Sequence, residues 1–207
     1  MRFPLRTYRW VLAASLLALA PACGRGGDVG QAGGDAPADT TPAATQAPPP
    51  PSQAGALTDG NIVAILAASG NSEIVPSDSV LNRVENDSVK KFAHDMITQH
   101  TALNDTVSTV ARQNNITPAP NAVSAQLDST SSAEVQRLKS LSGAQLDSAF
   151  MAYMVISHDS ARKAITEKLI PHAQNPQLRA TIHHQVLPMV EAHLARARNI
   201  QRYLGPS

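Results

Sequence analysis

Four stretches of the chain repeat apolar residues at alternating steps of three and four, the spacing of one face of an α-helix. The clearest stretch runs from Val89 to Val110 and includes apolar side chains at Ala93, Met96, Leu103 and Val107. His100 occupies a position of this stripe where the pattern calls for a hydrophobic residue. The other three stripes each carry one ionisable residue near the middle as well: Glu73, His158 and His193.

Capping residues and prolines set the expected bounds of the first two helices. The first begins near Thr58 and Asp59, either of which can cap a helix, and runs to about Arg83. Pro76 falls inside it and should kink it. The second is expected over residues 88–114.

The connection that follows is expected to be a loop over residues 118–130 and then a short helix. Ser131 and Glu134 form a capping box that would open this helix, which should run to Leu141. A third long helix is expected over about 144–170, where Pro171 bends or stops it.

A fourth long helix should begin after an N-cap at Asn175, with Pro176 at its first position, and run to about Leu204. Pro188 interrupts its stripe. No stretch shows the sustained alternation of a β-strand. The pattern therefore predicts an all-α fold, a four-helix bundle over 58–207 with a short extra helix between the second and third helices.

The first 22 residues have the pattern of a secretory signal peptide. Three arginines precede an apolar run over 10–20 that is too short to span a bilayer as a helix. Cys23, the single cysteine of the chain, follows Ala20-Pro21-Ala22 and resembles a lipidation site. Ordinary cleavage after Ala22 is the alternative, which would give a soluble secreted protein.

Residues 23–57 are expected to form a disordered linker rich in Pro, Ala and Gly. They carry almost no large apolar side chains and include a run of four prolines over 48–51, which favours stiff polyproline II. The expected arrangement is a spacer that holds the bundle away from a membrane anchored through Cys23. The expected location is the periplasm or the outer membrane, since Gly24 rather than Asp follows the cysteine.

Charge and composition exclude several classes of function. The net charge of +1 becomes +1 − 3 = −2 when the three signal-peptide arginines are removed, and only 3% of residues are aromatic, so nucleic-acid binding is not expected. With Cys23 alone, an intrachain disulfide or a thiolate metal site is impossible. We find no nucleophile elbow and no Gly-rich phosphate loop, and an enzyme is therefore not the preferred interpretation.

The four mid-helix ionisable residues should meet at one height inside the bundle. Three imidazoles and one carboxylate are a ligand set that suits a transition metal such as Cu, Zn or Fe. A methionine precedes each histidine by four residues, on the same helix face, and would be a soft auxiliary ligand: Met96, Met154 and Met189. The alternative is a metal-free layer in which buried His and Glu satisfy one another and Met only fills the core.

The remaining histidines lie off the apolar stripes. His94, His172, His183 and His184 are therefore expected at the surface or at the rim of the bundle.

Several ordered motifs over about 59–204 resemble a bacterial family catalogued as domain of unknown function 4142. They are Asn71-x-Glu73, Val89-Lys90-Lys91-Phe92-Ala93-x-x-Met96-x-x-x-His100, Leu141-Ser142-Gly143-Ala144-Gln145-Leu146-Asp147, Tyr153-Met154-x-x-x-His158 and Leu187-Pro188-x-x-x-x-His193-Leu194. The resemblance implies an exported domain, in many members described as an outer-membrane protein, and a ferritin-like bundle. The family has no settled activity.

The chain departs from the family pattern at two positions. Gln99 and Ser157 stand where members often carry Asp just before the histidine, so a carboxylate that could orient each imidazole is missing. The Glu-x-x-His pairs of di-iron sites are also missing, because Glu191 is two residues from His193. We therefore expect a non-catalytic envelope-anchored bundle that binds or buffers a metal ion, or else a structural or interaction module of the envelope.

Overall fold

The computed structural model describes residues 57–205. The signal peptide over 1–22, the lipidation site at Cys23 and the linker up to residue 56 lie outside the described residues. Leu57, the last residue assigned to the linker, packs against the core.

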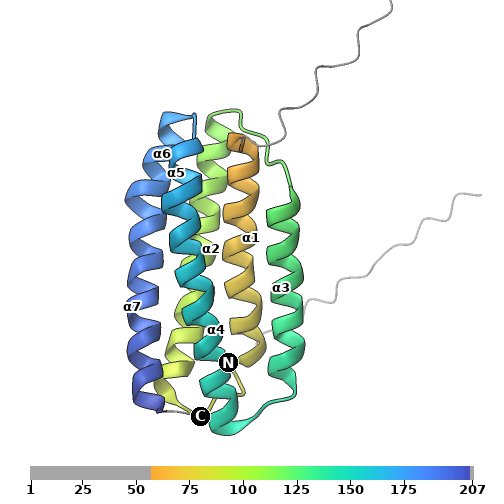
Figure 1. Cartoon of the computed structure of the whole chain (residues 1–207), viewed down its shortest axis with the longest axis vertical. Helices are drawn as coiled ribbons and strands as arrows, with labels where there is room; N and C mark the ends of the chain where they lie inside the picture. Colours follow the sequence, from red (N-terminus) through yellow and green to blue (C-terminus); the bar gives the residue numbers. More distant parts are fainter. Residues whose placement is uncertain (1–56, 206–207) are drawn as a thin grey trace, which may run out of the picture. The chain divides into compact units, whose positions relative to one another are not determined.

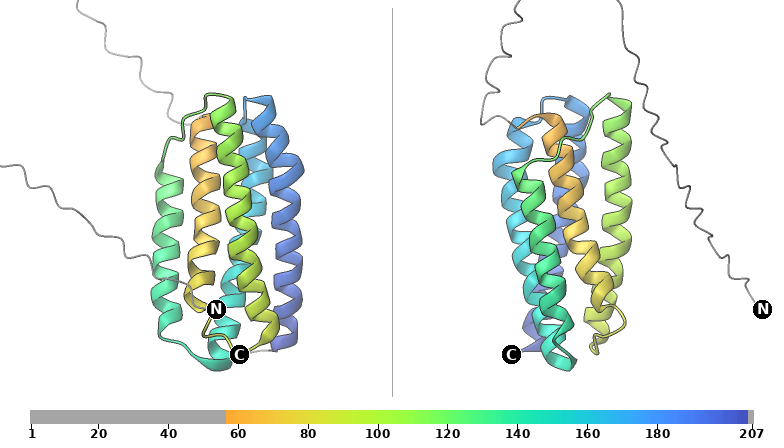
Figure 2. Two further views of the ribbon diagram at one scale, coloured as in Figure 1. Left: turned by 180° about the vertical axis from the view of Figure 1, so that it is seen from behind. Right: turned by 90° about the vertical axis from the view of Figure 1, so that its right-hand side faces the viewer.

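Within this part of the chain the fold is all-α, as predicted, and no strand is present. The described helices form five rods, of which four make up the bundle. Figures 1 and 2 show α3 along the outside of α1. The rods are α1 (Asp59–Val80), α2 (Asp87–Gln113), α3 (Ala122–Lys139), a rod of α4 (Gly143–Ala164), η1 (Ile165–Leu169) and α5 (Ile170–His172), and a rod of α6 (Pro176–Thr181), η2 (Ile182–Val186) and α7 (Leu187–Leu204).

The helix between α2 and α4 is longer than the sequence predicted: residues 118–121 form the expected loop, but the expected loop over 122–130 is wrong because α3 begins at Ala122. Asn121 caps α3, since its side-chain oxygen accepts hydrogen bonds from the backbone of Val123 at 2.9 Å and of Ser124 at 3.1 Å. Ser131 lies buried inside the helix, so the pair Ser131 and Glu134 does not open it. The serines and threonines of α3 look loop-like in sequence, but packing against α1 stabilises them in a helix.

Two aspartates at helix starts hold the loops at opposite ends of the bundle. Asp147, in the first turns of α4, accepts hydrogen bonds from the backbone of Glu85 at 3.1 Å and Asn86 at 2.9 Å. Asp59, the first residue of α1, accepts from the backbone of Gln174 at 2.8 Å and Asn175 at 2.9 Å. These bonds satisfy loop amides that would otherwise be unpaired and fix the order of the helices.

A π-helical turn precedes a proline in each of the last two rods. The rod of α4 ends at His172, one residue after Pro171, whereas the last rod continues past Pro188 to Leu204. The residue before Pro171 donates its backbone N–H to Ile165, and the residue before Pro188 donates to Ile182, each five residues back. A π-helical turn is one way to accommodate a ring that would clash with the carbonyl four residues earlier. Both η1 and η2 arise in this way, whereas α1 continues through Pro76 as an α-helix.

The interior consists of two clusters, at the two ends of the bundle. The lower cluster (lower in Figure 1) holds the aromatic and sulfur-containing side chains, among them Phe92, Met96, Leu146, Phe150 and Met154. The upper cluster is aliphatic and includes Ile65, Leu66, Val107, Ile165 and Val190. Among the described helices, none has the length and the apolar character needed to cross a membrane.

Candidate metal centre

The four predicted residues meet between the two clusters. Glu73 comes from α1, His100 from α2, His158 from α4 and His193 from α7, and all four are buried. The imidazole centroids lie 5.7 Å apart for His100 and His158, 5.1 Å for His100 and His193, and 5.4 Å for His158 and His193. The predicted convergence of one ionisable side chain per long rod is confirmed.

Two of the imidazoles are oriented by hydrogen bonds that their outer nitrogens make. His158 Nδ1 donates to the backbone carbonyl of Met154 at 2.8 Å, and His193 Nε2 donates to Gln99 Oε1 at 2.6 Å. Both acceptors place the proton on the nitrogen that faces them. His158 Nε2 and His193 Nδ1 are therefore left with free lone pairs.

These two nitrogens and His100 Nε2 are buried without a hydrogen-bond partner. One ring nitrogen from each histidine lies within 4.8 Å of the other two. The lone pairs of His158 Nε2 and His193 Nδ1 are buried without a proton donor or cation to bind, and buried polar atoms without partners are costly. The arrangement therefore favours a cation among the three rings.

Glu73 adds a negative charge beside them. Its Oε2 lies 2.8 Å from His100 Nε2, in close contact but not aligned for a hydrogen bond, while Oε1 accepts from Ser157 Oγ at 2.7 Å. Burial raises the pKa of this carboxyl, but the nearby His158 and His100 and the hydroxyl of Ser157 outweigh it and lower the pKa to about 2. The carboxylate is therefore ionised and available as a ligand at neutral pH.

His193 and His158 resist protonation. Burial, and then the proximity of His100 and His158, lowers the pKa of His193 from 6.5 to about 3. Burial also lowers the pKa of His158. Because protons are disfavoured there at neutral pH, these two rings keep the neutral form that metal ions require.

The predicted methionine ligands occupy different environments. Met96 and Met154 are fully buried in the lower cluster, one helical turn before their histidines, whereas Met189 is half-buried and outside both clusters. Their role as ligands stays a prediction. Of the other histidines, His94, His183 and His184 are exposed and His172 is half-buried, as expected from their positions off the stripes.

Sequence reasoning missed the supporting roles of Gln99 and Ser157. Both were identified as positions where a carboxylate is missing, yet the amide oxygen of Gln99 orients His193 and the hydroxyl of Ser157 holds Glu73. Each side chain bonds a residue on a neighbouring rod rather than the histidine that follows it. The signal was available, because a residue one step before a buried position lies at the edge of the helix face and can reach across to the next helix.

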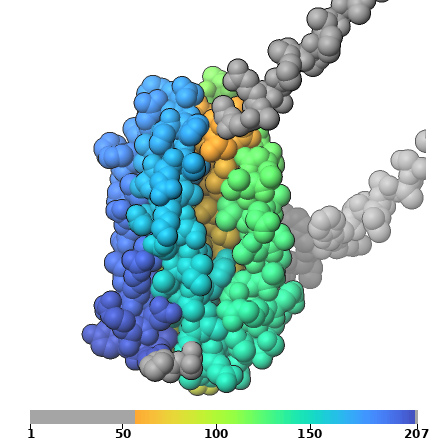
Figure 3. Space-filling model, in the orientation of Figure 1, coloured from red at the N-terminus to blue at the C-terminus, as the bar shows by residue number. Residues whose placement is uncertain are grey.

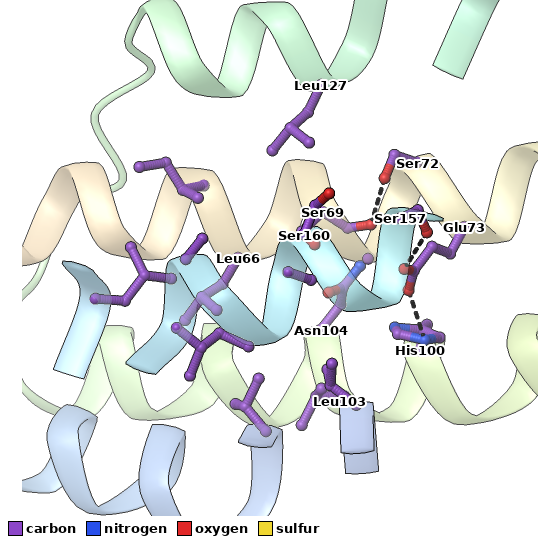
Figure 4. Close-up of a pocket in the computed structure, with 18 of the residues that line it drawn as sticks. Leu66, Ser69, Ser72, Glu73, His100, Leu103, Asn104, Leu127, Ser157 and Ser160 are labelled. Carbon is purple, nitrogen blue, oxygen red and sulfur yellow. Dashed lines mark hydrogen bonds and ion pairs between the residues drawn. The ribbon is translucent and has the colours of Figure 1, made fainter. Parts of the chain in front are cut away.

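A cavity of about 320 Å³ adjoins the site, and Glu73 and His100 line it. Figure 3 shows the surface groove above it, which runs between α3 and α4 with α1 visible at its floor. In the close-up of Figure 4, Ser72, Ser157, Glu73 and His100 gather toward one end, and Leu66 lies toward the other.

Comparison with solved structures supports the fold. The crystal structure of a protein from Streptomyces coelicolor, described as a candidate secreted protein with the domain DUF305, aligns with a TM-score of 0.60 and 11% sequence identity over 72% of this chain and 94% of that one. This ferritin-like neighbour shows a shared architecture alone. A search of curated proteins found no match.

A family model covers most of the chain, including all four residues of the site. It matches residues 41–200, and its description is "Domain of unknown function (DUF4142)". The resemblance noted in the sequence is thereby confirmed, and the chain belongs to the DUF4142 family.

Proposed function

We propose that this domain binds a transition metal ion, Cu, Zn or Fe, through His100 Nε2, His158 Nε2 and His193 Nδ1. Glu73 is the fourth ligand. The domain then serves to buffer or sequester metal rather than to catalyse a reaction. The single observation that carries the proposal is the group of three buried imidazoles between the two core clusters, with one ring nitrogen of each within 4.8 Å of the other two, and with His158 Nε2 and His193 Nδ1 lacking any hydrogen-bond partner.

The hydrogen bonds around the site support this proposal over a purely structural layer. In a metal-free network each imidazole would donate to or accept from another member of the layer. Here Glu73 lies 2.8 Å from His100 Nε2 and 3.3 Å from His158 Nδ1, but the outer nitrogens of His158 and His193 make their hydrogen bonds to Met154 O and Gln99, and the inner nitrogens of these two rings find no partner. Metal-bound histidines show this pattern, since their second nitrogen usually donates to a carbonyl or carboxylate.

The donor set points to borderline metals. Imidazole nitrogens suit Zn, Cu, Fe and Ni, and a carboxylate adds a harder ligand that neutralises part of the charge. If Met96, Met154 or Met189 also approached the ion, Cu(I) would be preferred. We further propose that the bundle works in the cell envelope as an exported lipoprotein, anchored to the membrane through Cys23.

The proposal is tested by direct metal binding to the purified full chain. Cu, Zn and Fe are each titrated against a chelator of known affinity, and the bound ion is counted by mass spectrometry. The test variant replaces His100, His158 and His193 together by Ala. The matched control replaces three exposed histidines, His94, His183 and His184, by Ala.

One ion per chain is expected in the wild type and in the surface variant, with affinity lost in the interior variant. Because three interior substitutions could unfold the bundle, Glu73→Gln is measured in parallel, with circular dichroism as the check on folding. Glu73→Gln should weaken binding at least about tenfold. Equal binding by the wild type and a folded interior variant would leave the layer as a structural device that fixes helix packing.

A further inference from the structure

The cavity beside the candidate metal centre has two chemically different ends. Its far end is walled by aliphatic side chains of four rods, among them Ile65, Leu66, Val107, Ile165 and Val186. Its near end is lined by Glu73 and His100, with Ser69, Asn104 and Ser157 beside them. An apolar cavity with a few polar groups at one end is the usual form of a small-molecule site.

The backbone is shaped around the apolar end. Ile165 and Leu169 in η1 and Val186 in η2 all line the cavity. π-helical turns inserted in α-helices are frequent at functional sites, and here both of those in the described chain border the same space. The side chains at this level are aliphatic and do not fill it, whereas aromatic rings fill the lower cluster.

The cavity opens to the outside between α3 and α4. Val123 on α3 and Ile156 on α4 both line it, and they are 51% and 67% exposed, although they are large hydrophobic residues. Figure 3 shows the groove at this place. A ligand can therefore reach the cavity without unfolding of the bundle.

Size limits the ligand to a single chain. A volume of about 320 Å³ is near the lower limit for small-molecule sites and too small for a lipid with two chains. At a rise of about 1.5 Å per residue, Ile65 lies roughly 12 Å from Glu73 along α1, the length of an extended chain of roughly eight to ten carbons.

The charge of the site at the polar end of the cavity determines which ligand head group can bind there. Without an ion, the carboxylate of Glu73 repels an anion at the polar end. A divalent ion bound to three neutral imidazoles carries two positive charges against the single negative charge of Glu73, so the loaded site is net positive. A carboxylate head group is then attracted to the ion and can add to the three histidines and Glu73 as a fifth ligand on the side of the cavity.

We propose that the cavity binds a medium-chain fatty acid, with its alkyl chain among the aliphatic side chains of the upper cluster and its carboxylate at the metal ion beside Glu73 and His100. This inference rests on the proposed metal site. It makes the domain a metal-dependent receptor for a single-chain carboxylate and gives the cavity beside the ion a function.

The test is calorimetric titration of decanoate into the full chain, first freed of metal and then loaded with Zn. Acetate provides the head group without the chain, and decanol provides the chain without the charge. Ala164→Phe fills the cavity away from the metal ligands. Ala102→Phe, at an exposed position of α2 outside the cavity, is the matched control.

Decanoate should bind the Zn-loaded protein at least about tenfold more tightly than the metal-free protein, because a tenfold change in Kd requires only a small change in binding free energy. Decanol should show no such dependence on Zn, and acetate should bind much more weakly than decanoate. Ala164→Phe should lose decanoate but keep Zn, and Ala102→Phe should keep both.

The outcomes separate the two proposals. If Zn binds but decanoate does not, or if decanoate binds Ala164→Phe as well as the wild type, the fatty-acid site is wrong and the metal site stands. If Zn does not bind in the metal titration of the purified chain, the proposed metal site is wrong, and the metal-dependent carboxylate site is wrong with it.

Discussion

The two halves of the bundle interior are built differently. Below the histidines, Phe92, Phe150, Met96, Met151 and Met154 are all fully buried, and the Phe92 and Phe150 rings meet edge to face with centroids 6.5 Å apart. Above the histidines the buried side chains are aliphatic, two rods have π-helical turns, and a cavity of about 320 Å³ remains.

This difference gives the candidate metal centre one closed and one open side. The Phe92 ring lies 6.4 Å from the rings of both His158 and His193 and closes the lower side. The upper side reaches the cavity through Glu73 and His100. The lower half is therefore closely packed against the rings, whereas the upper half leaves a cavity beside Glu73 and His100.

The largest expected effect comes from matched Leu→Ala changes in the two halves. Leu146→Ala leaves a void in the fully packed lower cluster and should lower the free energy of unfolding by about 4 kcal/mol. Leu66→Ala, at the cavity wall, should cost only about 2 kcal/mol, because this side chain already lacks neighbours on one side. Urea denaturation measures both, and equal losses would show that the halves are packed alike.

Matched Ala→Leu substitutions should affect the free energy of unfolding differently in the two halves. Ala93 is fully buried in the lower cluster, so the larger side chain should cost about 1 to 3 kcal/mol. Ala161 is half-buried at the cavity, where Leu should be neutral or stabilise by up to about 1 kcal/mol. Thermal melting of metal-free protein gives the comparison, and a large destabilisation by Ala161→Leu would contradict the presence of free space.

The hydrogen bond from His193 to Gln99 should matter more for metal than for folding. Gln99→Ala removes the acceptor that orients this ring and should weaken metal binding about 10- to 100-fold. Thr98→Ala, the neighbouring exposed position, is the control and should leave affinity unchanged. Unchanged affinity in Gln99→Ala would mean that His193 does not bind the ion.

The smallest effect is the pH dependence of metal-free stability. Since the folded pKa of His193 is about 3 against 6.5 for an ordinary histidine, the unfolded chain binds more protons below pH 6.5. Stability present above pH 6.5 is therefore lost as the pH falls toward 3, and the step from pH 7 to 6 should cost roughly 0.7 kcal/mol for this residue. The lowered pKa of Glu73 acts in the same direction between pH 4.5 and about 2.

Urea denaturation of metal-free protein at pH 7 and pH 6 measures the change. His193→Asn should reduce it, because the ring that titrates in the unfolded chain is gone. A metal-free wild type equally stable at both pH values would show that the ring is not desolvated.

The apolar periodicity predicted the four long rods and the meeting of Glu73, His100, His158 and His193, because a 3.6-residue repeat fixes which side of a helix is buried. It failed at α3, where Ser124 and Ser131 are buried instead of large hydrophobic residues. It could not predict the cavity, which depends on volumes left between several rods. The partners of Gln99 and Ser157 also depend on the distance and rotation between neighbouring helices.

The most direct test of the metal site is X-ray absorption spectroscopy of the full chain loaded with one equivalent of Zn. The account predicts three imidazole nitrogens and one oxygen at about 2.0 to 2.1 Å, with the multiple scattering that imidazole rings produce. A spectrum of oxygen ligands with one imidazole or none would contradict the claim that His100, His158 and His193 hold the ion together.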